Sequence, residues 1–146
     1  MRVVGLDFGE RRIGIAVSDV SRTLARPLHT IAPGTSLAER ITAVEAEIVQ
    51  LAGEPDGLAA VVVGLPYSLA GQPHAQTERV LAFVEALRDR TDIPVTLQDE
   101  RLTTVEADAR LALRESDWRR RKSRLDAASA AVILQDYLDQ KSEALG

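Results

Sequence analysis

The chain has 146 residues, of which 45% are hydrophobic and only 3% aromatic, and it contains no cysteine. This length suffices for a single domain, residues 1–146, whose core must be built from aliphatic side chains and alanine. The lack of cysteine excludes disulfide scaffolds and thiolate metal sites. No signal-peptide pattern or membrane-length apolar run occurs, so we expect a cytoplasmic protein that does not enter membranes.

The net charge is −4, although nucleic-acid-binding domains are usually basic. The cations are nevertheless concentrated, because five of the six residues from 119 to 124 are basic. These five follow Trp118 and are Arg119, Arg120, Arg121, Lys122 and Arg124. A smaller pair, Arg11 and Arg12, follows the first apolar segment. Both groups are candidates for contacts with nucleic-acid phosphates.

Three strands are predicted at the start of the chain, at residues 2–8, 13–18 and 23–31. The polar turn at residues 10–12 is so short that the first two strands must be antiparallel. Pro27 lacks the backbone N–H that a central strand needs, so we expect the third strand at the edge of the sheet.

Helices and strands alternate after Gly34. Ser36 and Glu39 have the spacing of a capping box, which predicts the start of a helix that ends at Gly53. The further predicted elements are a buried strand at 58–65, a helix from 74 to about 90, a strand at 93–98, a helix from the capping box Thr103–Glu106 to about 114, and a last helix from about 125 to 140. The basic residues 119–124 are expected in a loop before this last helix.

This order, three strands followed by α-β-α-β-α-α, predicts an α/β fold with a mixed five-stranded sheet. Crossover helices make the later strands parallel to the first one. The arrangement resembles that of ribonuclease-H-like proteins, in which helices flank the sheet. Ligands of such sheets bind at the carboxyl ends of the parallel strands, so the active site is expected where the first strand ends.

Three carboxylates stand in unusual surroundings. Asp7 interrupts an otherwise apolar strand, where a charge is costly unless a cation or hydrogen-bond donors meet it. Asp126 is the only charge within an apolar, hence buried, helical segment, although its spacing from Ser123 also fits a capping box. Glu100 ends a strand, a place where active-site residues and solvated glutamates both occur.

Together, Asp7, Glu100 and Asp126 supply hard oxygen ligands, which suit Mg²⁺ or Mn²⁺ and do not suit zinc. Two such ions about 3.5–4 Å apart can activate a water and stabilise the leaving oxygen in phosphodiester hydrolysis. The two histidines, His29 and His74, lack metal-ligand spacing, and no nucleophile-elbow pattern is present. These residues favour a metal-dependent nuclease.

Four segments resemble the motifs of the YqgF/RuvX family, whose members are ribonuclease-H-like resolvases and pre-16S rRNA nucleases of bacteria. The segments occur in the family order and span the chain. They are residues 5–9 and 12–19 (GLDFG and RIGIAVSD), 63–66 (VGLP) with Gly71, 99–104 (DERLTT) with Glu106 and Ala107, and 125–134 (LDAASAAVIL).

The resemblance implies that Asp7, Glu100 and Asp126 form the family's acidic metal-binding triad. Three further residues lie inside matched motifs and are expected to support the ligands, or to replace one in the case of the two aspartates. They are Asp19, Asp99 and Thr103. Arg101, in the third motif, is expected to contact nucleic acid, and Lys122 lies in the basic stretch that precedes the last aspartate in similar proteins.

The basic loop at 119–124 is expected to grip substrate phosphates without reading bases. Trp118 either stacks on an unpaired base or anchors the loop to the core. Arg11 and Arg12 lie on the turn next to Asp7, which places them near the scissile backbone.

The resemblance favours processing of the 5′ end of pre-16S rRNA, with ribosome-associated factors as partners. The alternative is resolution of branched DNA in recombination and repair, which needs two active sites and hence a homodimer. An Asp-x-Gly after a first strand also resembles the phosphate loop of actin-like kinases, but those proteins enclose a nucleotide between two such domains. A non-catalytic nucleic-acid-binding scaffold would gain nothing from three carboxylates facing phosphates.

Overall fold

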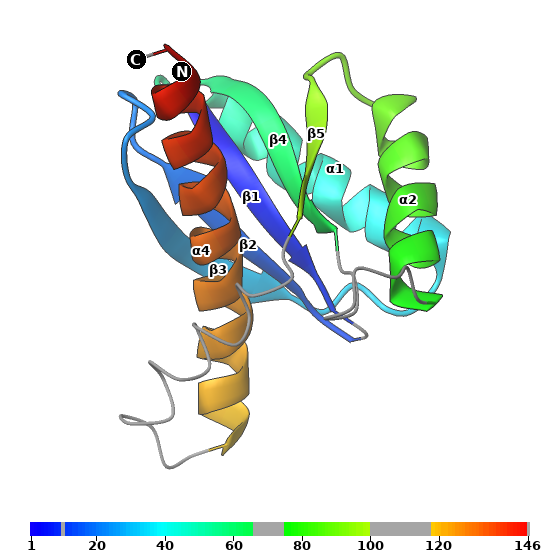
Figure 1. The fold of residues 1–146 in the computed structure, drawn as a ribbon. Coiled ribbons are helices and arrows are strands. Elements are labelled where there is room, and N and C mark those ends of the chain that lie inside the picture. The colour runs from blue at the N-terminus through cyan, green and yellow to red at the C-terminus, as the bar shows by residue number, and fades with distance from the viewer. Residues whose placement is uncertain (10, 66–74, 100–117, 146) are drawn as a thin grey trace.

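The computed structural model describes residues 1–9, 11–65, 75–99 and 118–145, and in the last helix it describes side chains from residue 127 to 141 (Figure 1). The strands are β1 (Arg2–Phe8), β2 (Ile13–Ser18), β3 (Ala25–Ile31), β4 (Leu58–Leu65) and β5 (Val95–Asp99). The helices are α1 (Leu37–Gly53), α2 (Ala75–Arg88) and α4 (Trp118–Leu145). The helix predicted from Thr103 to about 114 lies outside the described residues.

The five strands form one mixed sheet in the order β3-β2-β1-β4-β5. β2 is antiparallel to β1 and β3, whereas β4 is parallel to β1 and β5. This confirms the predicted α/β fold, with three antiparallel strands followed by parallel ones. Pro27 lies on β3 at the edge of the sheet, as predicted, because its ring nitrogen has no proton to donate to a further strand.

Helices cover both faces of the sheet. Successive side chains of each strand point to opposite faces, so each strand contributes residues to two separate cores. Leu6 and Phe8 of β1 belong to the larger core, which includes residues of α1 and α2. Val3 belongs to a second core on the other face, formed with α4. Figure 1 shows α4 crossing this second face.

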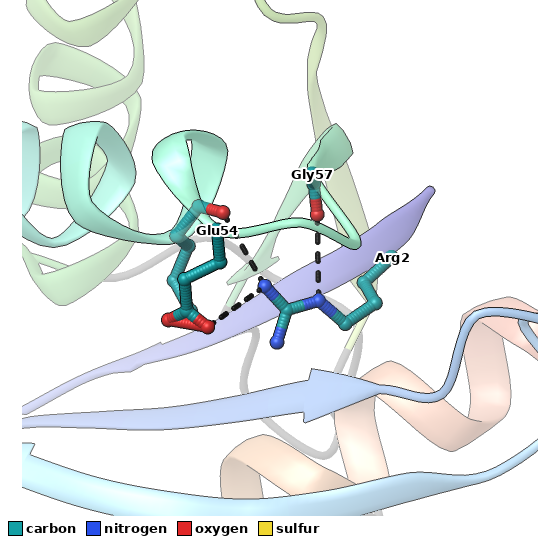
Figure 2. A network of polar contacts seen from close by, with 4 residues as sticks. Arg2, Glu54 and Gly57 are labelled. Carbon is teal, nitrogen blue, oxygen red and sulfur yellow. Dashed lines mark hydrogen bonds and ion pairs between the residues drawn. The ribbon is translucent and has the colours of Figure 1, made fainter.

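The first residue of β1 ties the strand to the end of α1. Arg2 is only 7% exposed. Its Nη2 donates to the Leu51 carbonyl (3.3 Å) and to the Glu54 carboxylate (3.2 Å), and its Nε donates to the Gly57 carbonyl (3.4 Å), as Figure 2 shows. The cation therefore lies at the negative end of the helix dipole, where it stabilises the last turn of α1.

One predicted helix start is confirmed and another is wrong. Ser36 Oγ accepts a hydrogen bond from the Glu39 N–H (3.1 Å) and donates to the Glu39 carboxylate (2.7 Å), so the two residues cap α1 as predicted. In contrast, α4 begins at Trp118 and not near residue 125, so residues 119–124 form helical turns and not a loop. The segment 118–145 contains no glycine or proline and is rich in strong helix formers, which lets the helix extend through the charges.

No helix in the described ranges combines the length and the hydropathy that a membrane-crossing segment needs.

Candidate active site

Asp7 lies one residue before the end of β1, on the face of the sheet that α4 covers. The alternation of side chains gives this placement, because Leu6 and Phe8 point into the core on the opposite face. On β2 the partner of Asp7 is Gly14, so no side chain flanks it on that strand. Asp7 is half-buried, and a carboxylate in such a position is stabilised by a cation or by hydrogen-bond donors.

α4 approaches β1 closely at Gly5. A Cβ at this position would lie 2.8 Å from the Leu134 Cβ and 3.1 Å from the Ala130 carbonyl oxygen. The partner of Gly5 on β2 is Ala16, which is fully buried beneath the same helix. Small residues on two adjacent strands thus allow the backbone of α4 to pack directly on the sheet.

This packing fixes the position of Asp126 along β1. The strand and α4 run in opposite directions (Figure 1), and Gly5 faces Ala130. Asp7 lies two residues beyond Gly5, about 7 Å along the strand. Asp126 lies four residues before Ala130, one helical turn or about 6 Å along the helix. Both steps lead toward the carboxyl end of β1, so Asp126 lies on the same side of the contact between α4 and β1 as Asp7.

The helical start at Trp118 also decides between two interpretations of Asp126. Ser123 lies inside α4 and is therefore not its N-cap residue. The capping-box interpretation of Ser123 and Asp126 is wrong. The prediction that Asp126 is a metal ligand therefore no longer has helix capping as its alternative.

The turn after Asp7 has a fixed shape. The Gly9 N–H donates to the Arg12 carbonyl oxygen (2.8 Å), and a Cβ on Gly9 would lie 2.8 Å from that oxygen. The turn therefore requires glycine at position 9. Arg11, which is exposed, and Arg12, which is half-buried, lie on this turn beside the end of β1, where the sequence predicted them.

A buried arginine supports this turn from the opposite face of the sheet. Arg40 of α1 is 5% exposed, and its Nη1 donates to the Gly9 carbonyl (2.7 Å) while its Nε donates to the Gly34 carbonyl (3.1 Å). Its guanidinium lies 4.6 Å from the centre of the Phe8 ring. Burial, and to a lesser degree the nearby charge of Arg79, lowers the pKa of Arg40. Sequence reasoning missed this residue.

The third predicted ligand follows a strand that does not touch β1. β4 lies between β1 and β5, and a strand spacing of about 4.8 Å places β5 about 10 Å from β1. Asp99, at the end of β5, is exposed and pairs with Leu65. Glu100, Arg101 and Thr103 lie outside the described residues. A ligand at position 100 would have to reach across β4 toward Asp7.

Asp19 is not part of this site, which corrects the expectation that it supports a ligand. It follows β2, which runs antiparallel to β1, and it lies five residues beyond Gly14, about 17 Å from the level of Asp7. Its carboxylate accepts hydrogen bonds from the N–H groups of Thr23 (2.8 Å) and Leu24 (3.2 Å) and from Ser21 Oγ (2.8 Å). These bonds, those from Thr23 and Ser21 foremost, lower the pKa of Asp19, which organises the turn between β2 and β3.

The basic residues 119–124 occupy the first two turns of α4. Figure 1 shows these turns projecting past the carboxyl end of β1, beyond the sheet. Successive helical residues are rotated by about 100°, so the five basic positions surround the helix and do not share one face. Trp118 is the first residue of the helix.

The described side chains include no group of three Asp, Glu or His residues close enough to hold a metal ion. Two of the three predicted ligand side chains, those of Glu100 and Asp126, lie outside them. The described part of the site comprises Asp7, Gly9, Arg11, Arg12 and Arg40.

The comparisons with other proteins agree with the motifs. A family model described as RuvX, Holliday junction resolvase, matches residues 1–140. A protein of Caldanaerobacter subterraneus subsp. tengcongensis, named "Putative pre-16S rRNA nuclease", is 42% identical over 143 residues, which is 97% of this chain and 98% of the relative. A protein of the same name from Burkholderia ambifaria is 41% identical over 141 residues, 97% of this chain and 91% of the relative.

Solved structures share the fold. RuvC of Thermus thermophilus matches with a TM-score of 0.57 at 20% identity, over 98% of this chain and 97% of that one. The fowlpox virus resolvase, solved in complex with Holliday junction DNA, matches with a TM-score of 0.58 at 9% identity, over 97% and 99% of the two chains. At such low identity the likeness shows a common ribonuclease-H-like fold.

Proposed function

The chain belongs to the RuvX family, and from this premise we propose that it is a metal-dependent nuclease that processes the 5′ end of pre-16S rRNA. The observation that supports this chemistry is that Asp7 lies near the carboxyl end of β1 on the face that α4 covers, and that α4 packs on Gly5 through Ala130, one helical turn after Asp126. The observation that favours the rRNA substrate is the name shared by relatives about 40% identical over nearly the whole chain.

The residues at the end of β1 suit a divalent cation. Asp7 is a half-buried carboxylate near the end of β1, opposite Gly14 on β2, and its oxygens are hard donors. Asp7, Asp126 and Glu100 would hold Mg²⁺ or Mn²⁺, whose role in such sites is to activate a water and stabilise the leaving oxygen.

The neighbouring residues would hold the substrate in place. Arg11 and Arg12 lie on the turn beside Asp7, where their charges would bind phosphates on either side of the scissile bond. Arg40 fixes the Gly9 carbonyl and so prevents this turn from moving relative to β1. The start of α4, with five cations in its first two turns, would extend the phosphate-binding surface beyond the sheet.

Resolution of four-way DNA junctions is the second candidate. The description of the family model and the fold shared with Thermus thermophilus RuvC favour it. Such a reaction cuts two strands at symmetrical positions and would therefore require two copies of the chain.

One comparison of substrates tests these proposals. Purified protein is incubated with labelled precursor 16S RNA, single-stranded DNA and a four-way junction, each with Mg²⁺, Mn²⁺ or EDTA. We expect metal-dependent cleavage of the precursor at its 5′ end. With that result, the proposed partners are ribosome-associated factors of the cytoplasm. Preferential cutting of the junction by a dimer would establish the resolvase instead. Binding without cleavage of any substrate would leave a non-catalytic scaffold.

A further inference from the structure

A cleft lies at the opposite end of the sheet from Asp7. It is a cleft of about 580 Å³ between the first residues of β1 and β4, the turn between β2 and β3, and the last turns of α4. Figure 1 shows these elements together near the two chain ends. The volume falls within the range of sites for small organic ligands.

The cleft combines an apolar floor with two cations. Val3, Ala60 and Leu138 form part of the floor, and Tyr137 contributes an aromatic ring. Arg22 and Lys141 line the same cleft, and neither forms an ion pair with a carboxylate in the part of the chain that the structure describes. The Lys141 ammonium lies 5.7 Å from the centre of the Tyr137 ring.

Arg22, which lines the cleft, has an unfavourable backbone conformation. Its φ is 58°, the left-handed region that a long side chain rarely adopts. A glycine or asparagine would form this turn at lower cost, and an outlier beside a cleft motivates a functional hypothesis for the side chain that occupies it. The left-handed conformation of Arg22 is an observation separate from the volume of the cleft.

The walls of the cleft are fixed before any ligand binds. Gln135 of α4 accepts a hydrogen bond from the Ala25 N–H (2.9 Å) and donates to the Thr23 carbonyl (2.8 Å), which clamps the turn between β2 and β3 onto the helix. Asp19 holds the same turn from within through Thr23 and Leu24. A preorganised cleft loses little conformational entropy on binding.

We propose that this cleft binds a small organic phosphate of the nucleoside monophosphate class. Arg22 and Lys141 bind the phosphate, and Tyr137 with the apolar floor receives the planar base. Asp139 also lines the cleft and opposes an anion, although one of its oxygens already accepts a hydrogen bond from Gln135 (3.0 Å). This site does not depend on the nuclease chemistry, because none of its residues belongs to the end of the sheet that carries Asp7.

Calorimetric titration of the full chain with AMP, adenosine and inorganic phosphate, in EDTA and at low salt, tests the proposal. We expect saturable binding of AMP, with adenosine and phosphate each at least about tenfold weaker. Arg22→Gly removes the cation and relieves the strained φ, so it should weaken AMP binding about tenfold without unfolding the protein. Lys141→Gln should do the same, whereas Asp139→Asn keeps the contact with Gln135 and should tighten binding.

Two controls distinguish this site from others. Arg90→Gln, at an exposed arginine elsewhere, and Asp7→Asn, at the candidate active site, should both leave AMP binding unchanged. The proposal is overturned if AMP does not bind wild type, if Arg22→Gly and Lys141→Gln bind it as tightly as wild type, or if Asp7→Asn abolishes binding. Phosphate alone binding as tightly as AMP would also overturn it, because the base would then have no site.

Discussion

At the scale of single residues, Arg40 shows how the end of β1 is stabilised. It is a buried cation that donates to two backbone carbonyls, of Gly9 and Gly34, and lies over the Phe8 ring. Removing the guanidinium leaves both carbonyls without this donor, and a buried polar group that loses its partner costs about 1–3 kcal/mol.

Arg40→Met should therefore lower the free energy of unfolding by about 2–4 kcal/mol in urea denaturation. The matched control is Arg90→Met, because Arg90 pairs with Glu45 at the surface (3.1 Å) and should change stability by less than about 1 kcal/mol. Equal losses in the two variants would show that Arg40 does not anchor the turn.

Asp19 gives a prediction for the dependence of stability on pH. Its pKa in the folded chain lies below its ordinary value of 3.8, so the unfolded chain takes up protons first as the pH falls. The stabilisation from Asp19 is thus complete above the unfolded pKa and is lost as the pH falls through the folded one. The difference in stability between wild type and Asp19→Asn should shrink as the pH is lowered from about 5 to about 2. A difference in stability that stays constant over this range would show that the pKa of Asp19 is not lowered in the folded chain.

The roles of some residues could be predicted from the sequence, and the roles of others could not. Asp7 could be found because a lone carboxylate in an apolar strand has few explanations. Asp19 was misplaced because it shares a motif with Asp7, although the antiparallel return of β2 carries it to the other end of the sheet. Arg40 lies four residues before Val44, on the apolar face of α1, and this position is the only sequence feature that suggested its burial. An arginine at such a position usually extends its charged end to solvent.

At the scale of elements, the contact between β1 and α4 positions Asp126. Gly5→Ala would place a methyl group 2.8 Å from the Leu134 Cβ, and such overpacking costs about 1–3 kcal/mol. It would also move α4 away from the sheet, so nuclease activity should fall more than the loss of folded protein explains. The measurement is unfolding together with cleavage at a temperature where the variant stays folded.

The matched control for this change is Gly53→Ala at the end of α1, where an added Cβ meets nothing within 4 Å. It should leave activity unchanged and raise stability by up to about 1 kcal/mol. Full activity in folded Gly5→Ala would show that the spacing of β1 and α4 does not matter to the site.

The first turns of α4 give a prediction about substrate binding. Changing Arg120 and Arg121 to Gln should weaken nucleic-acid binding and lower the slope of log K against log salt by about two, because each phosphate contact contributes roughly one. Metal binding should stay intact. The double change of Arg26 and Arg90, which are both exposed, is the control and should leave the salt slope unaltered. If the two double variants behave alike at low salt, the start of α4 does not bind substrate.

Elements were predictable where local signals and packing agree. The capping box of α1, the edge proline of β3 and the division into antiparallel and parallel strands followed from the sequence. The start of α4 did not, because a dense run of like charges was interpreted as a loop, whereas the helix-forming tendency of arginine and lysine extends the helix through it. The close approach at Gly5 was also beyond the sequence, since it depends on which helix crosses which strand.

At the scale of the whole molecule, the topology explains why the candidate site has its parts where it does. Parallel β1 and β4 end at one end of the sheet, and the first half of α4, which runs opposite to β1, extends toward that same end. The turn between β2 and β3 and the end of α4 help to form the cleft at the other end of the sheet. The fold and this division into two ends follow from the order of elements, but the choice between RNA and DNA depends on surfaces that the order does not specify.

The most direct test of the account is cleavage of precursor 16S RNA by Asp7→Asn beside wild type and Asp56→Asn, with Mg²⁺ titrated in each case. Asn is nearly isosteric but lacks the charge that holds a divalent cation, and Asp56 is an exposed aspartate after α1. We predict that Asp7→Asn loses about a hundredfold or more of the cleavage rate, while Asp56→Asn cleaves like wild type. Cleavage by Asp7→Asn at the wild-type rate and with the same Mg²⁺ dependence would contradict the account.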